Sequence, residues 1–432
     1  MLKQVSICSS VALSLSIFLA IGCGGGQGTS TTSTSPPPTQ TGPKSGSEFL
    51  YAFGTGNDVY VSPLNPTSGQ LGAYIDATPN LFPQIEPSSL VPNPVVSTPN
   101  GKFLYVAGFD QVDGGIAIFG LSVSGAAGQL APLSSFPTAL GPPLIPDYNG
   151  FVIDGKGRYL YVSYPDGPNA NHITPYSIDQ NSGLLTAVPG FEETSPVGQI
   201  ALQAADPAGR YVYAWATYPA GIEIFVYAID QNTGAVSEVP GSPFPVVSIT
   251  SGASNNVEYI QMFADPSEKY IYLYYVGAPA SPASSVANIY IYLVDPTTGA
   301  LTPTASSPFA VPSGAGGRVA VSPSGNLLYA QQSILSGTTY TPDIGVFQVN
   351  QVDGSIGANP IFSEPGSFGN SEAYPDPAGG VLLLGPGGTN YVTMWSFTVN
   401  NTTGTLTPSA GSPFFADNSY RDQRNYYILR VP

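Results

Sequence analysis

The chain has 432 residues, and 27 Asp and Glu against 11 Lys and Arg give it a net charge of −16. Proteins that bind nucleic acid need clustered Lys and Arg to replace the counterions of the phosphates, so this composition excludes that class of partner. Only 9% of residues are charged, and the many Gly (50) and Pro (44) disfavour helices. Since 27 Tyr and 20 Phe supply bulky apolar side chains, we expect a turn-rich all-β protein with a packed core.

Residues 1–22 are typical of a secretory signal peptide, because Lys3 precedes an almost continuous apolar run from Val11 to Ile21. This run is too short to span a bilayer. It ends in LAIGC at residues 19–23, which resembles the lipobox of bacterial lipoproteins. The resemblance implies that Cys23 is lipidated and becomes the first residue of the mature chain, so that the membrane is a partner through this anchor. An ordinary signal peptide is the alternative.

The residues after the cysteine predict where the anchor lies and what it carries. Gly24 stands where inner-membrane lipoproteins often have Asp, which implies the outer membrane of a bacterial cell envelope. Residues 24–47 contain no aliphatic or aromatic residue. We therefore predict a disordered tether over 23–47 and a folded domain over 48–432.

A glycine followed two residues later by an apolar residue recurs seven times in the folded part, at intervals of 50 to 65 residues. Most copies have the form Asp/Asn-x-x-Thr/Ser-Gly, which predicts a hairpin turn because the Asx side chain caps it and glycine accepts positive φ. The seven glycines are Gly69, Gly128, Gly183, Gly234, Gly299, Gly354 and Gly404.

A second repeated marker is a Pro-x-Gly type of turn followed by an aromatic strand, as in PAGRYVY at residues 207–213. In five of six copies a Tyr stands six residues after the start of the turn, and Leu383 takes its place in the last. The five are Tyr105, Tyr161, Tyr213, Tyr272 and Tyr329, and a looser copy ends in Tyr51.

Each repeat therefore has room for four short strands, and seven such units predict a seven-bladed β-propeller. The first unit lacks an obvious innermost strand, whereas the chain ends in the apolar stretch Asn425 to Val431. We predict that this stretch pairs into the first blade and closes the ring, because an open array would leave exposed strand edges.

The repeated text resembles the seven-bladed lactonase-like propellers, which include bacterial 6-phosphogluconolactonases and YVTN repeats. GSPF occurs at residues 241–244 and 411–414, and SPF at 307–309. The resemblance covers residues 48–432 and implies the propeller fold. Propellers serve hydrolases, isomerases and binding proteins alike, so the activity must be argued from the site.

Antiparallel connectivity places the Pro-x-Gly turns and the Asx turns on one face, because they join strands one to two and three to four. The opposite face carries the longer, irregular connections, and we expect the binding face there. These connections are residues 165–171, 248–257, 277–288 and 333–343.

Several common chemistries are excluded by residue counts. The chain has one histidine, and its Cys8 is removed with the signal peptide, so His-rich and Cys-rich metal sites are closed and we expect no metal. We also expect no cofactor, because the sequence has no phosphate-binding glycine loop. A Ser/His/Asp triad would have to use His172, for which a strand-end role is the alternative reading.

The family resemblance implies a GPRH phrase before one Pro-x-Gly turn, and here residues 316–319 read GGRV. Arg318 therefore stands at the family's histidine position. The glutamate expected after Tyr329 is absent, since residues 330–332 read AQQ, and no histidine occurs in residues 197–201. Each departure removes an acid, base or oxyanion partner of lactone opening.

A small polar set remains at the predicted channel mouth. Arg318, Glu372 and Gln261 occupy one column of the innermost strands, five residues before the turn proline in each case, and Glu258, Tyr259 and Tyr374 lie beside it. Arg318 is a candidate clamp for a carboxylate, with Tyr faces stacking on a sugar ring. An Arg318/Glu372 ion pair that only balances two charges is the alternative.

Two functions stay open. The first is a lipid-anchored binding propeller that presents its long-loop face to a sugar acid, a glycan or an envelope protein. The second is a lactone hydrolase with altered machinery, in which Arg318 polarises the carbonyl and Glu372 or His172 moves the proton.

Overall fold

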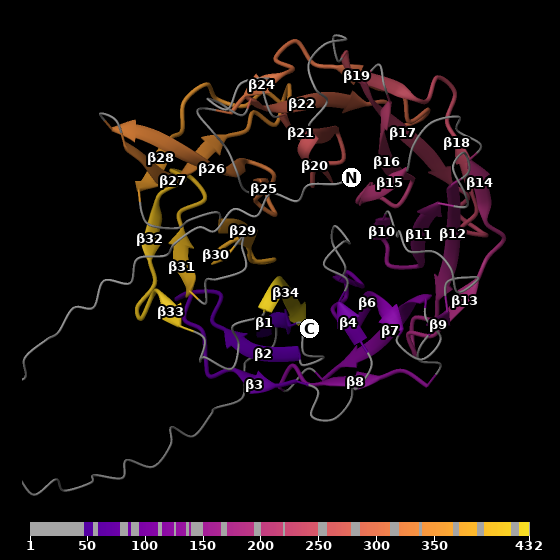
Figure 1. The fold of residues 1–432 in the computed structure, drawn as a ribbon, viewed down its shortest axis with the longest axis horizontal. Helices are drawn as coiled ribbons and strands as arrows, with labels where there is room; N and C mark the ends of the chain where they lie inside the picture. Colours follow the sequence, from indigo (N-terminus) through magenta and orange to yellow (C-terminus); the bar gives the residue numbers. More distant parts are fainter. Residues whose placement is uncertain are drawn as a thin grey trace, which may run out of the picture. The chain divides into compact units, whose positions relative to one another are not determined.

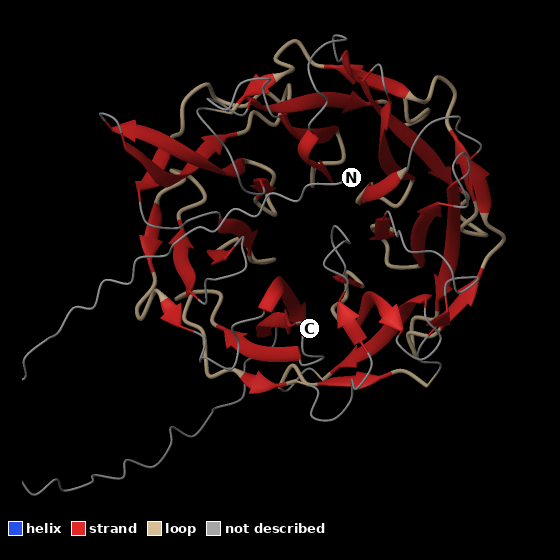
Figure 2. Cartoon of the chain, viewed as in Figure 1, coloured by secondary structure: helices blue, strands red, loops and turns tan. Residues whose placement is uncertain are grey.

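The computed structural model describes residues 47–54, 59–77, 85–87, 95–110, 115–124, 127–134, 138–139, 150–165, 171–193, 200–218, 221–248, 257–277, 286–311, 319–336, 339–365, 371–386, 393–415 and 423–431. In these ranges every regular element is a strand (Figure 2). The described residues contain no helix long and apolar enough to cross a membrane. The predicted signal peptide, Cys23 and nearly all of the predicted tether lie outside them.

The strands form seven antiparallel sheets arranged in a ring, which confirms the predicted propeller (Figure 1). From the axis outward, blade one contains β34 (Gln423–Val431), β1 (Ser47–Gly54), β2 (Val59–Leu64) and β3 (Ile75–Asp76). Blade two contains β4 (Ile85–Pro87) and β5 (Val95–Ser97), then β6 (Phe103–Asp110), β7 (Gly115–Val123), β8 (Leu130–Pro132) and β9 (Thr138–Ala139). Blade three contains β10 (Gly150–Ile153), β11 (Tyr159–Pro165), β12 (Asn171–Ile178), β13 (Leu185–Ala187) and β14 (Phe191–Glu193).

The remaining four blades repeat this order. Blade four contains β15 (Ala201–Ala205), β16 (Tyr211–Tyr218), β17 (Gly221–Ile229), β18 (Val236–Glu238) and β19 (Phe244–Ser248). Blade five contains β20 (Val257–Ala264), β21 (Tyr270–Gly277), β22 (Val286–Val294), β23 (Leu301–Pro303) and β24 (Phe309–Ala310). Blade six contains β25 (Val319–Val321), β26 (Leu327–Ser336), β27 (Thr339–Gln348) and β28 (Phe362–Pro365). Blade seven contains β29 (Ser371–Pro375), β30 (Val381–Pro386), β31 (Thr393–Val399), β32 (Leu406–Pro408) and β33 (Phe414–Phe415).

Two features refine the four-stranded prediction. In blades two to five and in blade seven the outermost strand is split into two short pieces that both pair with the third strand, as β18 and β19 do with β17. In blade six, most of the connection expected over 333–343 belongs to strands, because β26 and β27 pair as far as Ser336 and Thr339.

The ring closes as predicted from the C-terminal stretch. Strand β34 pairs antiparallel with β1, with Leu50 opposite Ile428 and Tyr51 opposite Tyr427. Blade one is thus built from both ends of the described chain, and its innermost strand comes last in the sequence.

The recurrent Tyr and Gly residues join neighbouring blades. The hydroxyl of Tyr105 in blade two donates to the carbonyl of Gly183 in blade three at 2.7 Å, and Tyr161 in blade three donates to Gly234 in blade four at 3.0 Å. At blade seven, where Leu383 replaces the Tyr, the hydroxyl of Ser396 donates to the carbonyl of Gly69 at 2.6 Å. A different residue therefore supplies the same hydrogen bond at the closing junction.

The Asx turns have the predicted geometry. Asp230 accepts the N–H groups of Asn232 and Thr233 at 2.9 and 2.8 Å, and Gly234 has a φ of 77°. The ring of Tyr159 lies where a β-carbon on Gly234 would stand, at 2.3 Å. Glycine is therefore required both by the turn and by the aromatic side chain of the preceding blade.

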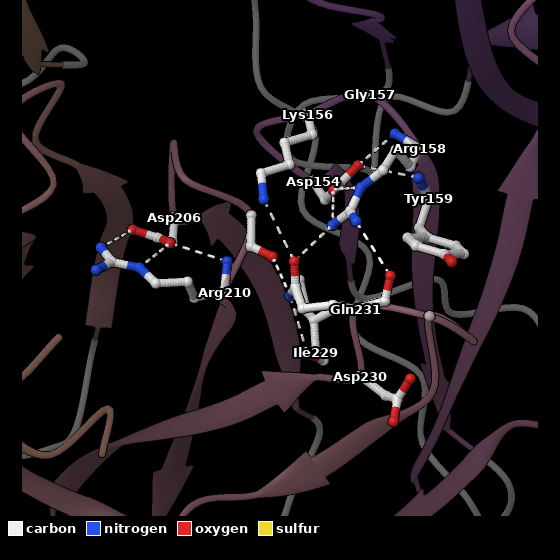
Figure 3. Close-up of polar contacts among 12 residues, drawn as sticks. Asp154, Lys156, Gly157, Arg158, Tyr159, Asp206, Arg210, Ile229, Asp230 and Gln231 are labelled. Atoms are coloured by element: carbon white, nitrogen blue, oxygen red, sulfur yellow. Dashed lines mark hydrogen bonds and ion pairs between the residues drawn. The ribbon is translucent and has the colours of Figure 1, made fainter. Parts of the chain in front are cut away.

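Figure 3 shows that the two kinds of turn meet on one face, as expected from the connectivity. Asp154, in the strand one to two turn of blade three, is fully buried and pairs with Arg158 at 3.1 Å. Arg158 also donates to the carbonyl of Gln231 at 3.2 Å, which lies in the strand three to four turn of blade four. Asp206 and Arg210 repeat this ion pair in blade four at 2.8 Å.

The closing junction contains a different pair of buried ionisable side chains. Asp376 occupies the position of Asp154 in blade seven, and the carboxyl of Glu48 from β1 lies within hydrogen-bonding reach of it. Their exposed fractions are 0% and 1%, and Glu48 accepts the N–H of Ala378 at 3.1 Å. Burial, followed by the charge of Asp376, raises the pKa of the Glu48 carboxyl to about 8.

Candidate functional site

A cavity of about 550 Å³ lies on the propeller axis. Its wall is formed by residues of β34, β5, β10, β15, β20, β25 and β29, so every blade contributes its innermost strand. In Figure 1 the labels β34, β10, β15, β20, β25 and β29 surround the centre of the ring. Pockets of this volume commonly hold a small molecule.

Apolar side chains such as Phe151, Phe263 and Val321 form part of the wall, and polar groups form part of it. Among the described residues of the wall, the polar ones are two glutamines, two tyrosines and a serine, and none is Asp, Glu, Lys, Arg or His. The wall therefore offers hydrogen bonds and apolar surface.

Gln203 and Gln261 come from neighbouring blades and are held in the same way. The carboxamide oxygen of Gln203 accepts the N–H of Met262 at 2.8 Å, and that of Gln261 accepts the N–H of Val319 at 3.2 Å. Because each oxygen is bound by the next blade, the carboxamide orientation is fixed and the NH₂ group is left to donate. Both side chains line the cavity.

Two tyrosines complete the polar part of the wall. The hydroxyl of Tyr374 in β29 is hydrogen-bonded to the carboxylate of Glu372 on the same strand. The hydroxyl of Tyr427 in β34 lies 2.8 Å from that of Ser97 in β5, so this pair joins blade one to blade two. Burial raises the pKa of Tyr427, which keeps its hydroxyl protonated.

The structure brings together part of the predicted set. Gln261 and Tyr374 line the cavity, and Glu372 reaches it through Tyr374. Tyr259 lies in β20 with its ring edge-on to Tyr274, at 6.1 Å between centroids. Arg318 and the side chain of Glu258 lie outside the described residues.

His172 is placed apart from this set. It lies in β12, the third strand of blade three, so β11 and β10 stand between it and the axis. Its ring stacks on Tyr164 at a centroid distance of 5.3 Å. The structure does not bring His172 together with Glu372 or Tyr374 in the cavity wall.

Sequence reasoning missed Gln203. Counting five residues back from the turn proline selects Leu202, but the pairing of β15 with β16 shifts register between Leu202 and Ala204. This bulge adds one residue and turns Gln203 toward the axis. The only sequence signal was a polar residue inside the apolar run from Ala201 to Ala205.

The chain is similar to known proteins in part of its sequence and in its fold. No protein-family model matches the chain. A segment of 102 residues is 36% identical to a 6-phosphogluconolactonase of Serratia proteamaculans (strain 568), and covers 24% of this chain and 26% of that protein. A segment of 88 residues is 38% identical to a 6-phosphogluconolactonase of Pectobacterium carotovorum subsp. carotovorum (strain PC1), covering 20% and 23%. The chain thus matches about a quarter of the length of these curated relatives.

Two solved structures share the whole propeller. A putative 6-phosphogluconolactonase from Bacteroides uniformis superposes with a TM-score of 0.59 at 16% identity, over 89% of this chain and 100% of that chain. The periplasmic gluconolactonase PpgL of Pseudomonas aeruginosa gives 0.58 at 14% identity, over 90% and 99%. At these identities the likeness shows the seven-bladed fold.

Proposed function

We propose that this propeller binds a lactone in its axial cavity and hydrolyses it to the hydroxy acid. The observation that carries the proposal is the polar set in the cavity wall, which combines two oriented carboxamides with a Tyr374–Glu372 pair. The sequence matches to 6-phosphogluconolactonases and the fold shared with PpgL support lactones as the ligand class.

The polar set has the parts that ring opening needs. Water adds to the carbonyl carbon, the ring C–O bond breaks, and the ring oxygen takes a proton. Glu372, acting through the hydroxyl of Tyr374, accepts the proton of the attacking water. The carboxamide NH₂ groups of Gln203 and Gln261 donate to the oxygen on which negative charge develops.

The test is ring opening of unsubstituted and sugar-derived δ-lactones, followed by acid release at constant pH. Tyr374→Phe and Glu372→Gln should each lower kcat/KM by at least about 100-fold. Tyr259→Phe is the matched control, because Tyr259 is not among the residues of the cavity wall. Arg318→Ala tests separately whether Arg318 polarises the carbonyl. Unchanged hydrolysis in Tyr374→Phe would remove this mechanism.

A second candidate is a propeller that binds its ligand without turnover. It is favoured by the absence of Asp, Glu and His among those described residues that line the cavity. Equilibrium binding of a lactone that is released unchanged by the wild-type protein would establish this function in place of hydrolysis.

We further propose that the propeller is held at the envelope membrane by a lipid on Cys23, at the end of the tether. The LAIGC sequence at residues 19–23 supports this placement. Metabolic labelling with a fatty acid should mark the wild-type protein and not Cys23→Ser. Equal labelling of both would show that the anchor lies elsewhere.

A further inference from the structure

Ser97 of β5 and Tyr427 of β34 form a pair of hydroxyls in the wall of the axial cavity. Their oxygens lie 2.8 Å apart. Opening of a lactone needs a proton donor, because the ring oxygen becomes a hydroxyl. Glu372 and Tyr374 take up a proton from the attacking water, and the two carboxamides only donate hydrogen bonds. The Ser97–Tyr427 pair is therefore the part of the polar wall that is available to supply this proton.

One hydroxyl proton of the pair is not used within it. Two hydroxyls carry two protons, and the bond between their oxygens uses one of them, whichever oxygen donates. The oxygen of Tyr427 also accepts the backbone N–H of Ser97. Neither hydroxyl is bonded to any further residue that the structure describes. The pair can thus donate one hydrogen bond to a ligand in the cavity.

Tyr427 is the stronger acid of the two, because a phenol gives up its proton more readily than an aliphatic hydroxyl does. Burial raises the pKa of Tyr427, whereas the hydroxyl and the backbone N–H of Ser97 lower it. Both groups of Ser97 stabilise the negative charge that the Tyr427 oxygen acquires when its proton leaves. Tyr427 therefore stays protonated at neutral pH and gives its proton only to a strong base, such as an alkoxide.

Tyr427 lines the side of the cavity across the axis from the two carboxamides. Its strand belongs to blade one, whereas β15 and β20 hold Gln203 and Gln261 on the far side of the ring (Figure 1). The ring of Tyr427 packs against a buried cluster that contains Val61 of blade one and Leu104 of blade two, which holds its hydroxyl in place. The two oxygens of a lactone diverge from the carbonyl carbon. A lactone whose carbonyl oxygen is bound by the carboxamides therefore turns its ring oxygen toward another part of the wall.

We infer that Tyr427 is the general acid of the reaction and gives its proton to the ring oxygen as the C–O bond breaks. The inference rests on the proposed function, because the lactone comes from it. The electron pair of the broken bond stays on the ring oxygen, which becomes the hydroxyl of the product. Tyr427 is left as a phenolate that the two donors of Ser97 stabilise. The proton taken up by Glu372 returns to it through water.

The experiment compares two δ-lactones with leaving groups of different basicity, using the full-length protein. Opening of δ-valerolactone releases an alkoxide, which needs a proton, whereas opening of dihydrocoumarin releases a phenolate, which is stable without one. Tyr427→Phe should lower kcat/KM by at least about 100-fold for δ-valerolactone and by less than about tenfold for dihydrocoumarin. Both lactones are measured on one preparation, so a loss of folded protein lowers both values equally and leaves their ratio unchanged.

Ser97→Ala is the matched control, because it breaks the same bond between blades one and two and keeps the hydroxyl of Tyr427. It should lower kcat/KM for δ-valerolactone by only about 5-fold. Equal losses in Ser97→Ala and Tyr427→Phe would show that the pair only joins the blades. A measurement on the wild-type protein needs no variant. Opening of δ-valerolactone should slow by a larger factor in D₂O than opening of dihydrocoumarin, because a second proton moves, and equal factors would contradict the inference.

The outcomes separate this inference from the proposed function. A wild-type protein that opens neither lactone would reject both. If the wild-type protein opens both lactones and Tyr427→Phe leaves the ratio of their kcat/KM values unchanged, the role of Tyr427 is overturned and hydrolysis in the cavity is retained. Tyr374→Phe should lower both values, because both reactions need an activated water.

Discussion

Blades three and seven place an aspartate at the same buried position of their first turn, yet they neutralise it differently. In blade three, Arg158 follows Asp154 by four residues and pairs with it. In blade seven that position is Gly380, where a β-carbon would lie 2.6 Å from the carbonyl oxygen of Pro66, so no side chain fits. Glu48 from blade one approaches Asp376 in its place. In blade three the buried carboxylate of Asp154 is balanced by the guanidinium of Arg158. In blade seven Asp376 is instead beside Glu48, whose raised pKa favours the protonated, uncharged form.

Two carboxyl oxygens without a hydrogen-bond partner at the closing junction support a protonated Glu48. Oε2 of Glu48 and Oδ2 of Asp376 have no hydrogen-bond partner among the described residues. Two carboxylates repel each other, whereas a protonated Glu48 donates to Asp376 and satisfies both oxygens. Burial is also the largest cause that raises the pKa of Asp376. We therefore expect the stability of the closing junction to depend on pH.

The largest difference is expected when the aspartate is removed from an Asp–Arg ion pair and, separately, from the Asp376–Glu48 carboxyl pair. Asp206→Ala leaves Arg210 and its backbone N–H without their buried acceptor, and should lower the free energy of unfolding by about 3 kcal/mol. Asp376→Asn keeps an oxygen to accept the N–H of Val381 and removes the repulsion with Glu48, so it should cost much less. Denaturant unfolding at pH 8 measures both. Equal losses would show that the two junctions are equivalent.

The next prediction concerns pH. Because the folded-state pKa of Glu48 is raised from 4.5 to about 8, its contribution to stability is fully present below pH 4.5 and is lost as the pH rises through 8. The free energy of unfolding should fall in this window by at most about 1.4 kcal/mol per pH unit. Glu48→Gln should flatten the slope in urea titrations made at several pH values. A slope that survives in this variant would assign the pH dependence to other groups.

The smallest expected effect concerns the recurrent tyrosines of the second strands. Tyr161 makes a hydrogen bond to the next blade, whereas the structure shows none to a described residue for the hydroxyl of Tyr272. Tyr161→Phe removes the hydrogen bond to Gly234 and should cost about 1 kcal/mol. Tyr272 occupies the same position in blade five, but its buried hydroxyl has no partner among the described residues. Tyr272→Phe should therefore be neutral or slightly stabilising when both variants are compared by thermal unfolding. A loss as large as that of Tyr161→Phe would mean that its hydroxyl is bonded in solution.

The fold was predictable because its determinants are local and repeated. Each Asx turn and each Tyr strand is specified within a few residues, and seven copies average out local exceptions such as Leu383. The closing strand was predictable because the first repeat lacked one strand and the chain ended with a spare one. Both inferences depend on counting strands, which repeats make possible.

The site was predictable only where the strands are regular. Gln261 and Tyr374 were found by counting back from the turn proline, which works in β20 and β29. In β15 the bulge shifts the count by one residue, so the same rule selects Leu202 and misses Gln203. The Glu48–Asp376 pair has no local signal, because its members are far apart in the sequence and meet only through ring closure. Contacts such as the Glu48–Asp376 pair form between neighbouring blades, so the sequence pattern of a single blade does not predict them.

Strand β34 makes synthesis of the last propeller strand a condition for a closed axial cavity. It forms the innermost strand of blade one and supplies Tyr427 and Ile428 to the cavity wall. The ribosome delivers these residues after the other strands of the propeller, so the ring stays open until they emerge. A message cut before codon 423 would encode a protein with an unpaired β1 edge and a cavity missing one side.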